Sequence, residues 1–203
     1  MEPTEGCALK AAESVPKSPD DALLSAMREP SSRRFVQAWL GWRGDTRLLP
    51  PRSAMELVDI RDLLGSVALF EICGPDEIRF KMAGARLREY ANFEASGRNF
   101  AELTPAEVWP IRRYRMMRMA CWPCAGISTK HDLRRLGEGS NFEFVTLPIG
   151  ADTPGGMPLL ITCVTPLGGE LEPTAPDREP VMLLADGFRF IDIGAGTPAR
   201  TNP

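Results

Sequence analysis

The clearest pattern in this sequence is the alternation of charged and hydrophobic residues in Glu77-Ile78-Arg79-Phe80-Lys81-Met82. Successive side chains of a β-strand point to opposite faces, so this pattern predicts a strand with one buried and one solvated face. Phe80 and Met82 would share the buried face with Ile78. A β-rich run over residues 67–73 precedes the strand, and the turn residues Gly74-Pro75-Asp76 separate the two. The two runs therefore predict a β-hairpin.

Short helices are predicted on the N-terminal side of this hairpin. One helical face is formed by Phe35, Val36, Trp39 and Leu40. Gly41 and Gly44 are expected to end this helix, because glycine is common just beyond a helix C-terminus. Ser53 and Glu56 have the spacing of a capping box, in which two side chains cap the start of a helix. They predict a helix or helical turn over residues 57–64.

Helical spacing returns after the hairpin and then gives way to further strands. Short helices are expected over residues 85–90 and 104–109, and a longer one over residues 111–121. Three β-rich runs follow, at residues 127–133, 142–149 and 157–167. This order predicts an α+β domain, in which helices cover one face of an antiparallel sheet.

The segments on either side of the predicted domain, residues 33–167, have a different composition. Residues 1–32 contain four prolines and little hydrophobic periodicity, so we expect a disordered N-terminal tail in which residues 21–28 could form a short helix. Residues 168–203 are interpreted as a linker followed by a C-terminal hairpin and tail. In this hairpin, Asp186-Gly187 would form the turn between two hydrophobic runs.

Composition and missing motifs exclude several classes of function. The chain carries 24 Lys and Arg against 27 Asp and Glu, a net charge of −3, which disfavours a nucleic-acid partner. No hydrophobic run reaches the roughly 18 residues that cross a bilayer, and no secretory signal is recognisable, so we expect a cytoplasmic protein without a membrane partner. The sequence has no Walker loop and neither the G-x-S-x-G nor the H-E-x-x-H motif, so no enzyme activity, catalytic residue or metal ligand is assigned.

Four short motifs occur in an order and spacing that resemble those of a PAS domain. They are Trp39–Gly44 with Pro51-Arg52, Ile78–Gly84, Gly97-Arg98-Asn99-Phe100, and Phe142-Glu143 leading to Leu147-Pro148. The chain also resembles a particular group, the small stand-alone PAS proteins common in alphaproteobacteria. The resemblance implies a five-stranded antiparallel sheet with short helices over one face. The sequence itself adds the N-terminal flanking helix and the C-terminal hairpin extension to this fold. It also implies a sensor in signal transduction, acting by ligand binding or protein–protein interaction, usually without catalysis.

A helical segment that crosses a sheet face is expected to leave a pocket for a small molecule. The candidate lining residues are Phe80, Met82, Leu87, Tyr90, Tyr114, Met117, Cys121, Ile127, Thr129, His131, Phe142 and Phe144. His131 is the only histidine, so it could ligate haem iron or another metal there, or it could be an ordinary surface or hydrogen-bonded residue. The sequence identifies neither the ligand nor a cofactor.

Two further sets of residues are candidates for a homodimer or partner surface. Phe35, Trp39 and Trp42 lie on the flanking helix, which in PAS domains commonly mediates dimerisation, although the three aromatics could equally pack on their own sheet. Arg112, Arg115 and Arg118 form a stripe that could bind an acidic partner or could be a solvated helix face.

Cys121-Trp122-Pro123-Cys124 is a C-x-x-C sequence with three interpretations. It could be a redox dithiol, half of a zinc site, or two unconnected thiols. A redox pair needs its first sulfur at a helix N-terminus, where the helix dipole lowers the thiol pKa. Here the pair follows a predicted helix, so ordinary free thiols are favoured, with a thiol redox protein as the alternative function.

Overall fold

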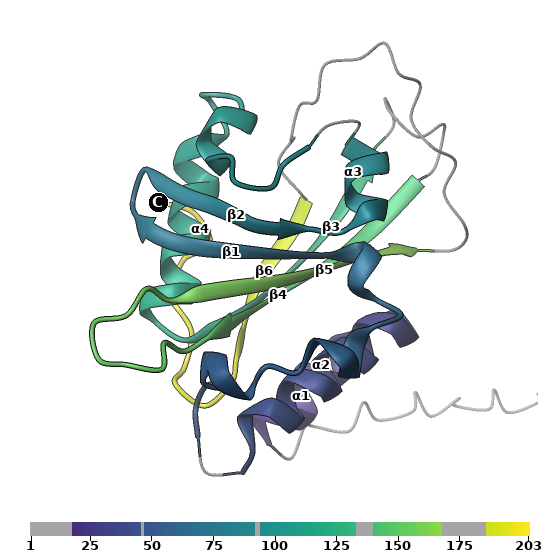
Figure 1. Ribbon diagram of the computed structural model, residues 1–203, viewed down its shortest axis with the longest axis vertical. Helices are drawn as coiled ribbons and strands as arrows, with labels where there is room; N and C mark the ends of the chain where they lie inside the picture. The colour runs from purple at the N-terminus through teal and green to yellow at the C-terminus, as the bar shows by residue number, and fades with distance from the viewer. Residues whose placement is uncertain (1–17, 46, 92–93, 133–139, 168–185) are drawn as a thin grey trace, which may run out of the picture.

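The protein folds around a single six-stranded sheet, as Figure 1 shows. The structure is a computed structural model that describes residues 18–45, 47–91, 94–132, 140–167 and 186–203. All strand pairs are antiparallel, in the order β2-β1-β5-β4-β3-β6. The strands are β1 (Val67–Gly74), β2 (Glu77–Ala83), β3 (Cys124–Asp132), β4 (Ser140–Ile149), β5 (Leu159–Leu167) and β6 (Asp186–Asp192). The α+β fold is therefore confirmed, and a C-terminal strand extends the five expected strands to six.

The sixth strand differs in one respect from the expected C-terminal hairpin. β6 pairs with β3 and lies at the edge of the sheet. Asp186 and Gly187 belong to this strand, and Asp186 pairs with Thr129 of β3, so the two residues are not a turn outside the sheet. The other half of the expected hairpin, residues 181–185, lies outside the described residues.

Helices cover both faces of the sheet rather than the one face that was expected (Figure 1). We call the two the N-terminal face and the α4 face. The N-terminal face carries α1 (Pro19–Ser25), α2 (Pro30–Arg43) and the 3₁₀ turns η1 (Arg52–Ala54), η2 (Leu57–Ile60) and η3 (Leu64–Ser66). The α4 face carries α3 (Ala85–Ala91), the 3₁₀ turn η4 (Phe100–Leu103) and α4 (Trp109–Cys121). Across the described ranges, no helix combines the length and hydrophobicity needed to cross a membrane.

Residues 18–32 are folded: the short helix considered over residues 21–28 forms as α1, and the disorder expected for the rest of this range is wrong. The Ser18 hydroxyl caps α1 by accepting the backbone N–H of Asp21 at 3.1 Å. Leu23 and Met27 are buried in the core of the N-terminal face. Composition alone suggested disorder, but the exposed hydrophobic surface of the sheet provides a partner for these two side chains. Residues 1–17 of the predicted tail lie outside the described residues.

A β-bulge at Lys81 separates two side chains that simple alternation places together. Leu69 pairs with Met82 and Phe70 pairs with Phe80, so Lys81 is an extra residue in β2. Phe80 consequently packs into the core of the α4 face, and Met82 packs against the core of the N-terminal face. The expectation that the two share a buried face is wrong, because a bulge shifts the alternation by one residue.

The predicted capping box between β1 and α2 does not form. The backbone N–H and the hydroxyl of Ser53 both donate to Oδ1 of Asp152, each at 2.8 Å, and Glu56 makes no side-chain cap. The predicted helix is instead a series of 3₁₀ turns, η1 to η3, which Asp152 ties to the loop between β4 and β5. A long-range carboxylate has thus replaced a local capping partner.

Two helix boundaries on the α4 face also differ from the prediction. The structure has η4 over residues 100–103 in place of a helix over 104–109. α4 begins at Trp109, before Pro110, whereas the prediction started the helix after this proline. A proline is tolerated in the first turn, because the backbone N–H it lacks has no partner there.

Gly84 allows the end of β2 to pass close to η3, and we expect Gly84→Ala to destabilise the fold by about 1–3 kcal/mol. A methyl group at Gly84 would clash with the backbone carbonyl groups of Leu64 and Gly65. The control is Gly41→Ala in α2, whose added methyl would have nothing within 4 Å. This variant should be as stable as the wild type or up to about 1 kcal/mol more stable. Urea unfolding measures both, and equal stability of the two variants would contradict the close approach.

Candidate functional site

The α4 face, where the ligand pocket was expected, has a well-packed hydrophobic core. The rings of Phe70, Phe80 and Phe100 lie against one another with centroids 4.5–5.2 Å apart. At the other end, α4 approaches β3 so closely that a side-chain carbon at Gly126 would clash with Sδ of Met119. These contacts bring the side chains of β1, β2, η4, α4 and β3 together in one hydrophobic cluster.

Five of the predicted pocket residues do belong to the α4 face. Phe80 lies within its core, and Leu87 and Met117 pack against that core. Phe142 and Phe144 alternate along β4 with Val145, which faces the opposite side, and their ring centroids are 6.2 Å apart. These residues therefore share a sheet face, and whether they also line a ligand cavity stays a prediction.

Other predicted pocket residues lie elsewhere, which corrects the expectation. Ile127 is buried in the core of the N-terminal face, and Met82 is partly buried against the same core. Thr129 lines a pocket on that face. β3 runs with Cys124 toward the α4 core, so alternation directs Ile127 and Thr129 to the opposite side. The side chains of Tyr90 and His131 lie outside what the structure describes. The backbone of His131 pairs with Asn141 of β4.

The three aromatics proposed for a dimer surface are interior residues. Phe35, Trp39 and Trp42 are buried in the core between α2 and the sheet. Nε1 of Trp39 donates to the backbone oxygen of Pro148 at 2.9 Å, and Nε1 of Trp42 donates to Asp59 at 2.8 Å. This corrects the expectation of a surface for a second copy, because these side chains are occupied by their own domain.

The arginine stripe of α4 is only partly solvated. The guanidinium of Arg112 lies 4.7 Å from the ring centroid of Phe100, and burial, followed by the charge of Arg115, lowers its pKa to about 10. Arg115 lies 4.2 Å from the ring centroid of Phe188, and burial lowers its pKa as well. Arg118 is exposed. Two members of the stripe thus have contacts within the chain and are not displayed freely to an acidic partner.

The C-terminal residues cover the outer side of α4 (Figure 1). The Tyr114 hydroxyl donates to the backbone oxygen of Arg200 at 3.2 Å, and Arg115 donates to that of Thr201 at 3.2 Å. Nε1 of Trp122 donates to the backbone oxygen of Ala195 at 2.9 Å. Tyr114 therefore anchors the C-terminal segment and does not line a pocket under the helix.

The cysteines of the C-x-x-C sequence occupy different environments. Cys121 is exposed at the end of α4, whereas Cys124 is buried, and both are free thiols. Burial, with a smaller contribution from Asp192, raises the pKa of Cys124 to about 12. Burial therefore favours a Cys124 thiol that stays protonated, and the first sulfur of the pair, Cys121, follows α4 rather than starting a helix. Within the described residues, no group of three His, Cys, Asp or Glu side chains is placed to hold a metal ion.

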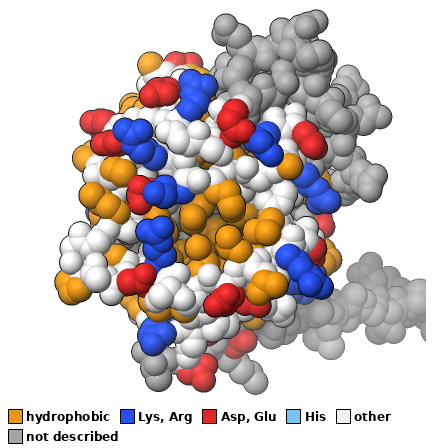
Figure 2. Space-filling model, in the orientation of Figure 1, with side chains coloured by type: hydrophobic (Ala, Val, Ile, Leu, Met, Phe, Trp, Pro, Cys, Tyr) orange, Lys and Arg blue, Asp and Glu red, His pale blue; other side chains and the backbone are white. Residues whose placement is uncertain are grey.

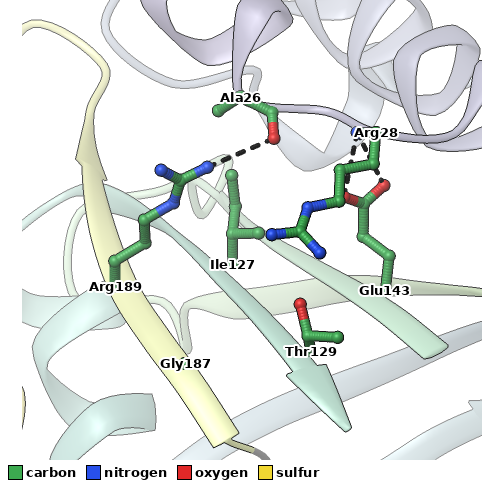
Figure 3. Close-up of a pocket in the computed structure, with 7 residues that line it drawn as sticks. All are labelled: Ala26, Arg28, Ile127, Thr129, Glu143, Gly187 and Arg189. Atoms are coloured by element: carbon green, nitrogen blue, oxygen red, sulfur yellow. Dashed lines mark hydrogen bonds between the residues drawn. The ribbon is translucent and has the colours of Figure 1, made fainter. Parts of the chain in front are cut away.

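A pocket of about 270 Å³ lies on the N-terminal face, beneath the link that joins α1 to α2 (Figure 3). It is lined by Ala26, Arg28, Ile127, Thr129, Glu143, Gly187 and Arg189. The link, residues 26–29, forms its roof, and strands β3, β4 and β6 form its floor. Among these residues only Ile127 and Thr129 were sequence candidates.

Glu143 connects the floor of this pocket to its roof. Its side chain is buried, with the residue only 1% exposed, and its carboxylate accepts the backbone N–H of Arg28 at 3.0 Å and that of Glu29 at 3.3 Å. A buried carboxylate needs such donors, because it has lost the water that would solvate its charge. A signal for this role exists in the sequence, since Glu143 shares its strand face with the hydrophobic Val145 and Leu147.

Two arginines reach the pocket from opposite sides (Figure 3). Arg189 of β6 donates to the backbone oxygen of Ala26 at 3.2 Å. The guanidinium of Arg28 extends into the pocket, and it has no hydrogen-bond or ion-pair partner among the residues that the structure describes. Sequence reasoning missed both, because exposed arginines carry no local signal and 160 positions of chain separate them. The site is thus a small polar pocket with two guanidinium groups at a junction between helices and sheet.

We expect Glu143→Gln to destabilise the protein by about 1–3 kcal/mol, because an amide offers only one acceptor to the two N–H groups of the link. Hydrogen exchange at Arg28 and Glu29 should accelerate in the same variant. The matched control is Glu107→Gln, which removes an exposed carboxylate without a side-chain partner in the described structure. Urea unfolding and amide exchange measure the two effects. Wild-type exchange rates in Glu143→Gln would show that the carboxylate does not hold the link.

We expect Cys124 of the folded protein to resist alkylation until strongly alkaline pH. Its pKa is raised from an ordinary value of 9.0 to about 12, so the folded state keeps a proton that the unfolded chain loses. This contribution to stability is complete below pH 9.0 and decreases as pH rises toward 12. Mass spectrometry of iodoacetamide labelling at increasing pH measures it, with exposed Cys121 as the internal control. A labelling midpoint for Cys124 at or below 9.0 would contradict the raised pKa.

Comparison with known proteins agrees with this architecture. A family profile described as PAS domain matches residues 27–156, which is more than half of the chain. The match begins in the link between α1 and α2 and ends in the loop between β4 and β5. Neither the curated proteins nor the solved structures gave a match. The sheet order, the helices over it and this match together place the chain in the PAS domain family.

Proposed function

We propose that this chain is a cytoplasmic sensor or adaptor without catalytic activity. In this proposal a small molecule binds in the pocket beneath the link, and the signal passes through the N-terminal helices to a second copy or another protein. PAS domains in general are sensory and signalling modules, which supports this class of function. The observation that carries the proposal is the position of the pocket, whose roof is the link between α1 and α2 and whose floor belongs to the sheet.

A ligand at this junction has a direct means of changing the structure around it. A ligand shifts a conformational equilibrium only by its difference in affinity between two states. A molecule in this pocket would contact Ala26 and Arg28 on one side and Thr129 on the other. Its affinity would therefore depend on how α1 and α2 are seated on the sheet.

A surface feature supports an output through protein contacts. Figure 2 shows hydrophobic side chains gathered near the middle of the view, bordered by Lys, Arg, Asp and Glu side chains. A hydrophobic patch with a charged rim is typical of surfaces that bind another protein. We assign the partner or dimer contact to this region rather than to the buried aromatics of α2.

Native mass spectrometry of protein taken directly from the producing cell tests the proposal. The wild type is expected to retain a small-molecule mass, or to be found as a dimer or partner complex. Thr129→Phe should fill the pocket from a strand position that accepts aromatics, and should lose the bound mass. Glu77→Phe, at the exposed start of β2, is the control and should keep it. Partner-free monomers that carry no added mass in the wild type and both variants would contradict the proposal.

A further inference from the structure

We infer that the pocket beneath the link selects small organic anions, whose carboxylate or phosphate group binds between Arg28 and Arg189. The inference rests on the proposed function, because it takes the same pocket as the sensory site. It goes further by naming the chemistry that the pocket recognises.

The first argument is the unused hydrogen-bonding capacity of the two arginines. A guanidinium carries five N–H donors in a planar fork that matches a carboxylate or phosphate. No side-chain N–H of Arg28 donates a hydrogen bond to a residue that the structure describes. Arg189 donates to one backbone oxygen, that of Ala26 at 3.2 Å. Two guanidinium groups, each with unused N–H donors, therefore border one cavity from different elements (Figure 3).

The second argument concerns the carboxylate that also lines the pocket. Glu143 directs its oxygens to the N–H groups of Arg28 and Glu29, which compensate its charge. The charged groups of the lining are then two guanidinium groups and one carboxylate, which sum to +1. One negative charge on a ligand would neutralise this lining, and a neutral ligand would leave it positive.

The third argument concerns the size and remaining walls of the cavity. Its volume of about 270 Å³ is slightly below the range of about 300–1,000 Å³ typical of drug-sized ligands. Ala26 and Ile127 offer hydrophobic contact, and Thr129 offers a hydroxyl. These walls suit a compact hydrophobic body attached to one anionic group. They distinguish such a ligand from a bare inorganic ion, which would leave the hydrophobic wall uncovered.

Three compounds that share a benzene ring test whether the anionic charge of a ligand, rather than its shape, determines binding. Benzoate and phenyl phosphate carry an anionic group, and benzamide is their neutral counterpart. Each is titrated into the ¹⁵N-labelled full chain at constant ionic strength, and the backbone amide signals of Arg28, Thr129 and Gly187 are followed. We expect saturable shifts of these signals with at least one of the two anions. Benzamide should bind at least about tenfold more weakly, as the loss of a charged hydrogen bond requires.

Arginine variants locate the effect. Arg28→Gln and Arg189→Gln should each weaken binding of the anion by about tenfold. Arg61→Gln removes the same charge from an exposed arginine remote from the pocket lining and should bind as the wild type does. Thermal unfolding of each variant shows whether it is folded. Using both pocket variants keeps the test decisive if one of them fails to fold.

The outcomes separate failure of this inference from failure of the proposed function. Equal binding of benzamide and benzoate at these amides would overturn anion selectivity while leaving a small-molecule pocket. Anion shifts that persist in Arg28→Gln and Arg189→Gln would overturn the assigned residues. No shift with any of the three compounds would also overturn the inference, and the bound mass in native mass spectrometry would then decide the proposed function independently.

Discussion

Both faces of the sheet carry hydrophobic side chains, and neither face can be left in water. Ile127, Val145 and Ile161 point to one side, while Phe70 and Phe80 point to the other. Burial of such surface contributes about 25 cal/mol per Å², which makes it the dominant favourable term. The chain therefore needs helices on both sides, and the short N-terminal helices are the only described cover for one of them. Their amino-acid composition resembles that of a flexible tail, yet the sheet gives them a binding surface.

Polar contacts then determine how the N-terminal helices are seated. The hydroxyl of Ser32 donates to that of Thr165 at 3.0 Å, and Arg43 of α2 bonds to Asp20 of α1. Glu143 adds bonds from the sheet to the link. Hydrogen bonds to a buried carboxylate depend on geometry in a way that hydrophobic contact does not. The pocket lies beside these directional contacts, where the link between α1 and α2 meets the sheet.

The α4 face follows a different principle, in which cations cover aromatic rings. Arg112 lies over Phe100 and Arg115 over Phe188, and the C-terminal residues then close over the outer side of α4. Arginine suits this role because its planar guanidinium stacks on a ring and keeps donors for backbone oxygens. The arginine stripe, which the sequence suggests is a charged surface, thus takes part in packing α4 against β6.

Local periodicity in the sequence was sufficient for the type and order of most elements. The signals for three elements come from residues only a few positions apart. These elements are the strand over residues 77–83, the helix around Trp39 and the turn before Glu77. Tertiary structure alone decided the rest. The bulge at Lys81 moved Met82 to the other face, and a long-range bond to Asp152 replaced a local cap. The pocket joins segments near residues 28, 129, 143 and 189, and no local pattern can bring them together, because their proximity results from strand pairing and helix packing over the whole chain.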